Sequence, residues 1–363
     1  MSRLGELGTV ITGNTPKTSD SENYVSNDIC FVKPSDIVED DISMLSSTEF
    51  YISEYARSKS RILPKQSILV TCIGIIGKVA INEIECSFNQ QINAIIPNNN
   101  MCNTKYLAYA IHSKKRALQV MANAAVVPII NKKQFSDIEI TLPPMEQQQH
   151  IAAVLGKVSE LIDLRKRQLA KLDELVKARF VEMFQDESIV YPKKRIDLVC
   201  REIIAGGDRP KDTSDMQTED YPYPVFANAA TNEGVLCYAK TYRIESASVT
   251  VSARGSTVGY TAIREGKYTP VVRLIALVPN DELTPIYLKQ YLDVNHCVVS
   301  TGSAQPQVTI PYIKGIEVVV PPLKEQDTFT KLVKQVDKQK LTIQQSLDKL
   351  ETLKKSLMQE HFG

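Results

Sequence analysis

The sequence predicts a mixed α/β protein in which two globular domains alternate with two long helices. Two segments, residues 142–184 and 320–362, repeat one another without a gap at an offset of 178 residues, the separation of Pro143 and Pro321 (321 − 143). Before and between them, short apolar runs bounded by glycine, proline and asparagine are typical of strands. We therefore expect globular domains over 1–142 and 185–320, and helices over 143–184 and 321–363.

Length and composition agree with this organisation. The chain has 363 residues, of which 43% are apolar. At roughly 100–200 residues per domain, this length fits two or three domains. No apolar stretch is long enough to cross a bilayer, and the opening MSRLGELG lacks the apolar core of a signal peptide. These features predict a cytoplasmic protein that does not associate with membranes.

Each repeat has the features of a long helix with a sharp start. It begins with a Pro-Pro pair and then contains no proline. Such a pair forces the preceding residue into extended backbone, so the helix begins only after it. The remainder is rich in leucine, lysine, glutamate and glutamine, which favour helix. Some 40 helical residues would extend roughly 60 Å at about 1.5 Å per residue.

Apolar residues in both repeats alternate at spacings of three and four, which is the pattern of a coiled-coil seam. The first seam comprises Leu155, Val158, Ile162, Leu169, Leu172 and Val176, and the second comprises Val333, Val336, Ile343, Leu347 and Leu350. Arg165 interrupts the first seam, whereas Lys340 and Lys354 interrupt the second. Because single polar seam residues fix register and partner, these different interruptions indicate that each helix is fitted to the other.

The sequence of the first domain predicts a compact α/β unit. It opens with Gly13-Asn-Thr-Pro16, a sequence typical of a turn. We predict strands over 29–32, 67–71, 78–82 and 93–96, followed by a helical stretch near 106–120.

The second domain keeps the same order of elements with different residues. The corresponding pairs are Gly13-Asn-Thr-Pro16 with Gly206-Gly207-Asp-Arg-Pro210, 68–77 with 249–259, Tyr106 with Tyr287, and Val127-Pro128 with Gln305-Pro306. Two domains that share a framework and differ in surface indicate two related but distinct binding specificities.

No motif in the sequence indicates catalysis, a metal or a cofactor. The seven cysteines are widely spaced and never form a C-x-x-C pair, which argues against disulfides and a zinc site. A methyltransferase would need Asn or Asp before Pro-Pro, but the two pairs follow Leu142 and Val320. A magnesium-dependent nuclease would need a lysine beside clustered acids, and Asp137-Ile-Glu139 has none. We therefore expect a protein without catalytic activity.

The spacing Gly74-x-x-Gly77 also occurs in phosphate-binding loops. However, neither a Lys-Ser or Lys-Thr pair nor a helix start follows it. We interpret it as a tight turn between two strands.

Several motifs together point to a known family. They are Leu142-Pro-Pro-Met-Glu-Gln147 and Val320-Pro-Pro-Leu-Lys-Glu-Gln326 at the helix starts, Gly13-x-Thr-Pro16 in the first domain, and the strand-turn-strand around 74–77. With the tandem order of domain and helix, this combination resembles the specificity (S) subunit of type I restriction-modification systems over essentially the whole chain.

This resemblance implies a function and a set of partners. Each globular domain would be a target recognition domain that reads one half of a bipartite site in double-stranded DNA. The two helices would pack antiparallel as a spacer with pseudo-twofold symmetry and dock two methyltransferase (modification) subunits. Restriction subunits would join afterwards, and the S subunit itself would catalyse nothing.

The chain departs from the family pattern in two motifs. The second domain has Gly207-Asp-Arg-Pro210 in place of Gly-x-Thr-Pro, and the first has Cys72-Ile-Gly74 where Ala253-Arg-Gly255 carries the basic residue frequent in the family. The overall charge, 43 basic against 42 acidic residues, is also less basic than that of an independent DNA-binding protein. Partner subunits can supply phosphate contacts in such a complex.

Basic residues near turns are the candidates for DNA contact, because arginine and lysine side chains bind phosphates and base edges. They are Lys17, Arg57, Lys59 and Arg61 in the first domain and Arg209, Lys211, Arg243 and Arg254 in the second. The alternative for each residue is a solvated surface charge.

A different class of function also fits the repeat and the seam. A coiled-coil adaptor could use its helices to oligomerise and its globular domains to bind proteins. The divergence of the two domains on one framework separates these hypotheses, because an adaptor that binds two copies of one ligand would not need it.

Overall fold

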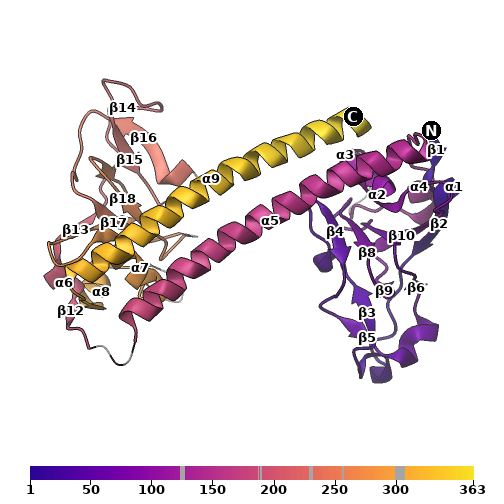
Figure 1. Cartoon of the computed structure of the whole chain (residues 1–363), viewed down its shortest axis with the longest axis horizontal. Coiled ribbons are helices and arrows are strands. Elements are labelled where there is room, and N and C mark those ends of the chain that lie inside the picture. The colour runs from indigo at the N-terminus through magenta and orange to yellow at the C-terminus, as the bar shows by residue number, and fades with distance from the viewer. Residues whose placement is uncertain (123–126, 187, 189, 229–231, 256, 299–306) are drawn as a thin grey trace. The chain divides into compact units, whose positions relative to one another are not determined.

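The computed structural model describes residues 1–122, 127–186, 188, 190–228, 232–255, 257–298 and 307–363 (Figure 1). The chain divides into two compact units. Unit 1 comprises Met1–Lys166 together with Gln345–Gly363, and unit 2 comprises Arg167–Gln344. Unit 1 therefore contains both ends of this sequence.

The two repeats form the long helices α5 (Met145–Phe184) and α9 (Leu323–Phe362), each of 40 residues. Both begin directly after a Pro-Pro pair, as the sequence predicts. The first part of α5 and the last part of α9 belong to unit 1, and the remaining parts belong to unit 2.

Unit 1 is a mixed α/β unit with two main sheets. In chain order its other elements are β1 (Ser2–Arg3), α1 (Leu4–Leu7), β2 (Gly8–Thr12), η1 (Ser21–Tyr24), β3 (Ile29–Val32), η2 (Pro34–Asp36), β4 (Ile42–Leu45), β5 (Tyr51–Ile52), η3 (Glu54–Lys59), β6 (Ile62–Leu63), β7 (Ile68–Thr71), β8 (Val79–Asn82), β9 (Cys86–Phe88), β10 (Ile92–Pro97), α2 (Thr104–Ser113), α3 (Lys115–Ala122), α4 (Lys132–Ser136) and β11 (Glu139–Ile140). One sheet has the order β2-β10-β7-β8-β4 and the other β5-β3-β9-β6, while β1 pairs with β11. The four predicted strands are confirmed to within one residue, and the predicted helical stretch divides into α2 and α3 at Lys114.

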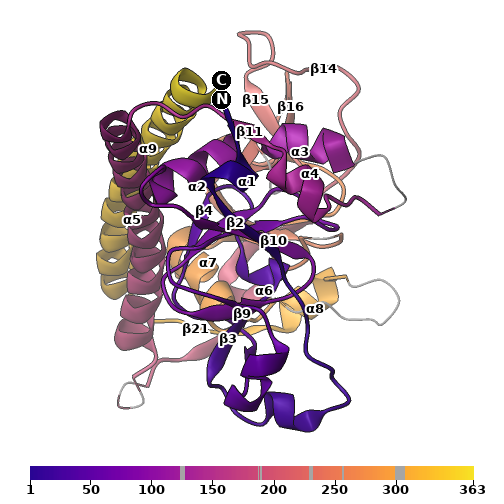
Figure 2. The same ribbon diagram turned by 90° about the vertical axis from the view of Figure 1, so that its right-hand side faces the viewer.

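The main core of unit 1 lies between the five-stranded sheet, α2 and the long helices (Figures 1 and 2). Ile151 and Leu155 of α5 pack there with side chains of β7, β8 and α2. The last turns of α9 add Leu357 and Phe362, whose ring centroid lies 5.3 Å from that of Tyr106. The core of this unit is thus completed by residues distant in the sequence.

Unit 2 repeats the same types of element. They are β12 (Lys193–Arg195), α6 (Ile196–Val199), β13 (Cys200–Ala205), β14 (Thr213–Ser214), β15 (Tyr223–Phe226), η4 (Asn232–Gly234), β16 (Val235–Ala239), β17 (Ser248–Ser252), β18 (Thr261–Arg264), β19 (Thr269–Pro270), β20 (Leu274–Pro279), α7 (Pro285–Val294), α8 (Ile310–Gly315) and β21 (Glu317–Val319). Its sheets have the orders β13-β20-β17-β18 and β14-β16-β15-β19, and β12 pairs with β21. The predicted loop residues Gln305 and Pro306 lie outside the described residues.

An aromatic cluster forms the centre of unit 2. Phe180 of α5 lies 5.5 Å from Tyr287 of α7 and 5.4 Å from Phe329 of α9, measured between ring centroids. Phe184 packs edge-on against the same Tyr287 and Phe329 rings. Each aromatic ring removes a large apolar area from water, so this cluster packs both long helices against α7 of unit 2.

Gln148 and Gln326, which occupy equivalent positions in the two repeats, tie the start of each long helix to the globular part of its unit. In unit 1 the Asn103 N–H donates to Gln148 Oε1 at 2.9 Å, and Gln148 Nε2 donates to Pro143 O at 2.8 Å. In unit 2 the Thr284 N–H donates to Gln326 Oε1, and Gln326 Nε2 donates to Pro321 O, both at 2.8 Å. Both glutamines are buried. A buried amide without partners would be unfavourable, so these bonds explain why both repeats have glutamine at this position.

The seam residues lie on the least exposed face of each helix. Leu155, Val158, Ile162, Val336 and Leu347 are buried, and Leu169, Leu172, Val176, Val333, Ile343 and Leu350 are half-buried.

Within unit 2 the two helix segments run antiparallel. Phe180 meets Phe329, while Asp173 forms an ion pair of 2.6 Å with Lys340. Lys354, which interrupts the second seam in the sequence, belongs to unit 1. Its ammonium forms an ion pair of 2.5 Å with Asp41, and its side chain is 14% exposed.

The surroundings of His112 in α2 predict that unit 1 is sensitive to acid. Its Nδ1 is buried and has no hydrogen-bond partner among the described residues. Burial lowers the pKa of this imidazole, an effect that nearby Asp41 opposes and that Lys354 and Lys115 reinforce. As the pH falls below about 6.5, His112 becomes protonated in the unfolded chain, whereas in the folded chain it becomes protonated only at lower pH. We therefore expect unit 1 to lose stability as the pH falls below that value.

We expect His112→Gln to reduce this pH dependence. The measurement is hydrogen exchange of unit 1 amides at pH 7.5 and 5.5, corrected for the intrinsic exchange rate. The exposed His150→Gln serves as the matched control and should keep the parent's pH dependence. Equal acid sensitivity in the parent and His112→Gln would contradict the prediction.

Candidate nucleic-acid interface

The basic cluster predicted in the first domain lies in and just after η3 of unit 1. The Arg57 guanidinium donates to Glu54 and, at 2.6 Å, to Glu85. Lys59 Nζ lies 2.8 Å from Asp20 and 3.5 Å from the centroid of the Tyr55 ring. Hydrogen bonds to these carboxylates raise the pKa of both basic groups. Arg57 and Lys59 therefore have to exchange protein carboxylates for phosphates if they bind DNA.

The Gly13-Asn-Thr-Pro16 segment, which follows β2, positions this cluster. Asn14 donates through its side-chain amide to Lys59 O and accepts from the Arg61 N–H, both at 2.8 Å. The Arg61 guanidinium donates to Thr12 O. A Cβ at Gly13 would lie 2.1 Å from Asn89 O, so only glycine fits this close approach. Lys17, directly after this segment, is exposed.

Three of the predicted residues in unit 2 lie beside or after the Gly206-Gly207 segment, in which Gly207 forms a parallel bridge with Val271. The Arg243 guanidinium donates to Ala205 O at 3.1 Å and lies beside Gly207. Arg209 donates to Thr213 Oγ1 at 3.0 Å, and Lys211 is exposed. These contacts are with neutral oxygens, so the positive charges remain available to an anion.

Arg254 lies in a different turn, the one between β17 and β18. Gly255 and Gly259 of this turn have φ of 90° and 86°, and the corresponding Gly74 and Gly77 between β7 and β8 have φ of 76° and 88°. The Gly77 N–H donates to Thr71 O, and the Gly259 N–H donates to Ser252 O, each at 2.9 Å. The prediction that Gly74-x-x-Gly77 is a tight turn between strands is confirmed.

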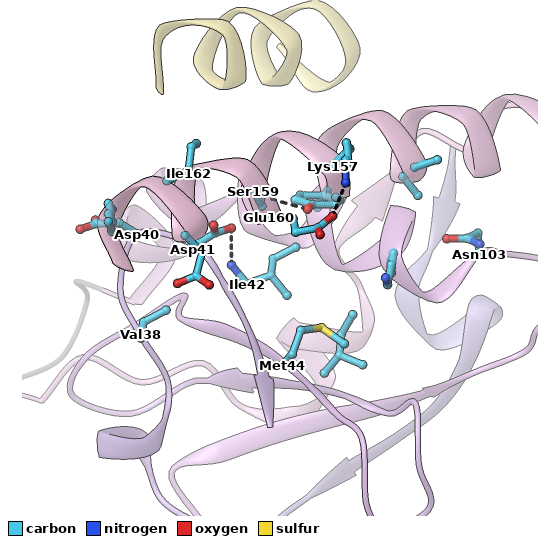
Figure 3. A pocket seen from close by; sticks show the side chains of 18 of the residues that line it. Val38, Asp40, Asp41, Ile42, Met44, Asn103, Lys157, Ser159, Glu160 and Ile162 are labelled. Carbon is cyan, nitrogen blue, oxygen red and sulfur yellow. Dashed lines mark hydrogen bonds and ion pairs between the residues drawn. The ribbon is translucent and has the colours of Figure 1, made fainter. Parts of the chain in front are cut away.

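A cavity of about 1110 Å³ lies in unit 1 between the 38–44 segment and the first half of α5 (Figure 3). Its acidic lining residues are Glu39, Asp40, Asp41, Glu160 and Asp163, and its basic ones are Lys105, Lys157 and Lys166. Lys157 pairs with Glu160 at 2.8 Å, and Asp41 accepts the Ile42 N–H at 2.7 Å. An excess of carboxylates repels phosphates, so this cavity does not suit the DNA backbone.

In the described part of the chain, no group of three or more His, Cys, Asp or Glu side chains could hold a metal ion. Among the same residues, no helix is long and apolar enough to span a bilayer.

Comparison with known proteins identifies the family. Residues 1–174 and 194–353 match the family model described as the type I restriction modification DNA specificity domain. The chain belongs to this family. The resemblance predicted from the repeat motifs is confirmed, and the protein is a type I specificity subunit.

Relatives and solved structures agree with this assignment. A Mycoplasma pneumoniae protein provisionally named type I specificity subunit S.MpnORF507P is 29% identical, with 70% of each chain covered. The MjaIX specificity subunit of Methanocaldococcus jannaschii is 32% identical over 52% of this chain and 46% of its own. The crystal structure of the type I S subunit from M. genitalium has a TM-score of 0.68 at 14% identity, covering 99% of this chain and 95% of that one. The mixed α/β fold with two globular parts and long helices is therefore confirmed for this specificity subunit.

Proposed function

We propose that this specificity subunit reads a bipartite site in double-stranded DNA, with one half-site for each globular domain, residues 1–142 and 185–320. The observation that supports this most directly is the pair of matched glycine turns. Both connect antiparallel strands and use the same backbone hydrogen bond, yet one carries Ile73 before its first glycine and the other carries Arg254. One framework with different side chains is what two different half-sites require.

The helices would dock two methyltransferase subunits, and restriction subunits would join that complex. Leu175 and Leu353 occupy equivalent positions in the two repeats and are 48% and 46% exposed. An exposed leucine repeated on each helix offers two similar surfaces to two copies of one partner. The subunit itself would position the DNA and leave catalysis to its partners.

The double substitution Leu175→Asp with Leu353→Asp should weaken methyltransferase binding by on the order of tenfold or more, because it places charge in an apolar contact. Titration calorimetry with the cognate methyltransferase measures this effect. Leu236→Asp, at a β16 leucine that is 44% exposed, provides a matched control and should bind like the parent. Equal affinities of the double variant and the parent would place the docking surface elsewhere.

Methylome sequencing tests the function as a whole. A host expressing this subunit with its methyltransferase is compared with a host expressing the methyltransferase alone. We expect methylation of a split motif, two short defined halves around a fixed gap, only when the subunit is present. No subunit-dependent methylation, with the methyltransferase expressed and bound, would favour the coiled-coil adaptor instead.

A further inference from the structure

The two glycine turns are connected to the rest of their units through the same backbone contacts. In unit 1 the Cys72 N–H donates to Gln91 O, and Cys72 O accepts from the Ile130 N–H, both at 2.8 Å. In unit 2 the Ala253 N–H donates to Arg273 O at 2.7 Å, and Ala253 O accepts from the Val308 N–H at 2.8 Å. Cys72 and Ala253 are therefore equivalent positions.

Next to these positions, each unit has one isolated antiparallel bridge. Ile73 pairs with Ile129 in unit 1, and Arg254 pairs with Gln307 in unit 2. Side chains of directly opposed residues in an antiparallel pair lie on the same face, roughly 5 Å apart at Cβ. Each unit thus presents two adjacent side chains at the same place, which are apolar in unit 1 and polar in unit 2.

The apolar pair in unit 1 comprises the half-buried Ile73 and the exposed Ile129, and exposed apolar side chains lie around it. Ile129 is 44% exposed, and Ile75 of the turn and Val127 of the adjacent loop are 52% and 56% exposed. Single exposed apolar residues are common, but several around one turn indicate a surface that a partner covers. Gly74 donates its N–H to Pro128 O at 3.1 Å, so the turn and the loop are joined there.

Hydrogen bonds hold the backbone of the polar pair in unit 2 in place. The Asn228 side-chain amide donates to Arg254 O at 2.5 Å, and Thr257 Oγ1 donates to Asn228 O at 2.9 Å. Arg273 holds φ of 75°, which is unfavourable for a residue other than glycine. Such a backbone presents the Arg254 side chain from a defined position.

Arg254 also differs from the basic residues of the first domain in its electrostatic surroundings. Arg57 and Lys59 each bind carboxylates of their own unit. Across the described residues, by contrast, no carboxylate forms an ion pair with the exposed Arg254. The Arg254 guanidinium can therefore bind an external acceptor without first breaking an ion pair.

We propose that these two bridge pairs are the base-reading positions of the two domains. Arginine makes paired hydrogen bonds with guanine, glutamine does so with adenine, and apolar side chains contact the methyl group of thymine in the major groove. Arg254 with Gln307 then reads purines, including a guanine, in the half-site of residues 185–320. Ile73 with Ile129 reads a thymine in the half-site of residues 1–142. This assignment rests on the proposed bipartite recognition.

The test is methylome sequencing with the parent subunit, Arg254→Ala, Arg254→Gln and Ile73→Arg. With either Arg254 substitution, one half of the motif should lose its guanine preference by on the order of tenfold or more, while the other half stays unchanged. Ile73→Arg should alter the opposite half alone. Arg254→Gln keeps an exposed polar side chain, so it reports on recognition even if Arg254→Ala folds poorly.

Arg201→Ala is the matched control, since Arg201 is an exposed arginine of β13 at the end of the sheet opposite Ala253. Its motif should equal that of the parent. A split motif that Arg254→Gln leaves unchanged overturns the assignment, as does uniformly weaker methylation of the same motif, which indicates a phosphate contact. If the parent itself yields no split motif, the proposed function fails, and the assignment fails with it.

Discussion

Adding seven residues to each long helix is expected to lengthen the unread spacer of the DNA site by about three base pairs. Seven residues make one heptad, so the seam continues in register. They extend a helix by about 10 Å at 1.5 Å per residue, against about 3.4 Å per base pair. The insertions belong between Lys166 and Arg167 and between Gln344 and Gln345, where unit 1 meets unit 2 in the sequence. Both half-site sequences should stay the same.

This expectation follows from the proposed role of the helices as a spacer. Half-sites one helical turn apart lie roughly 34–36 Å from centre to centre, a distance that helices of about 60 Å can bridge. Methylome sequencing gives the spacer length directly. A seven-residue insertion between the exposed Asn99 and Asn100 controls for added length as such and should leave the motif unaltered. Unchanged spacing in the helix variant, with both half-sites still read, would refute the spacer role.

Phe180→Ala should destabilise unit 2 by about 3–5 kcal/mol. The Phe180 side chain is fully buried and packs against Phe184, Tyr287 and Phe329. Its removal leaves a cavity where two helices and α7 meet. Because the chain has two units, hydrogen exchange of unit 2 amides is the suitable measurement of the opening free energy.

Val181→Ala supplies the control for this substitution. Val181 is the next residue of α5 and is 39% exposed. Surface substitutions usually change stability by no more than about 0.5 kcal/mol. If Phe180→Ala and Val181→Ala have equal effects, the aromatic cluster does not hold unit 2 together.

The elements with strong local signals could be predicted from the sequence. Proline pairs mark the starts of α5 and α9, and β3 has the predicted bounds because four apolar residues lie between polar ones. The turns at Gly74 and Gly255 were predictable since a positive φ favours glycine. Local periodicity carries no information on tertiary partners, however. Lys354 looks like a seam interruption in sequence, yet it pairs with Asp41 of the first domain.

The same limit applies to the predicted DNA contacts. The basic cluster around Arg57 looked available because its carboxylate partners Glu85 and Asp20 lie 28 and 39 residues from the groups they bind. Of these ion pairs, only the one between Glu54 and Arg57 could be predicted from the sequence, because the two residues lie three positions apart. The bridge between Arg254 and Gln307 was likewise not predictable, because β18, β19, β20 and α7 lie between the two residues in the sequence.

The packing of Phe362 against Tyr106 has a consequence for synthesis of the chain. Domains usually fold in the order in which the ribosome delivers them, the N-terminal one first. Residues 167–344 form a continuous unit and can close their aromatic cluster before residues 345–363 are made. Unit 1 needs those residues, which arrive roughly 200 residues after Lys166, or about 10–40 s later at typical translation rates. During that interval its nascent core lacks the cover of α9, so the part of the protein that is translated first is the part that finishes folding last.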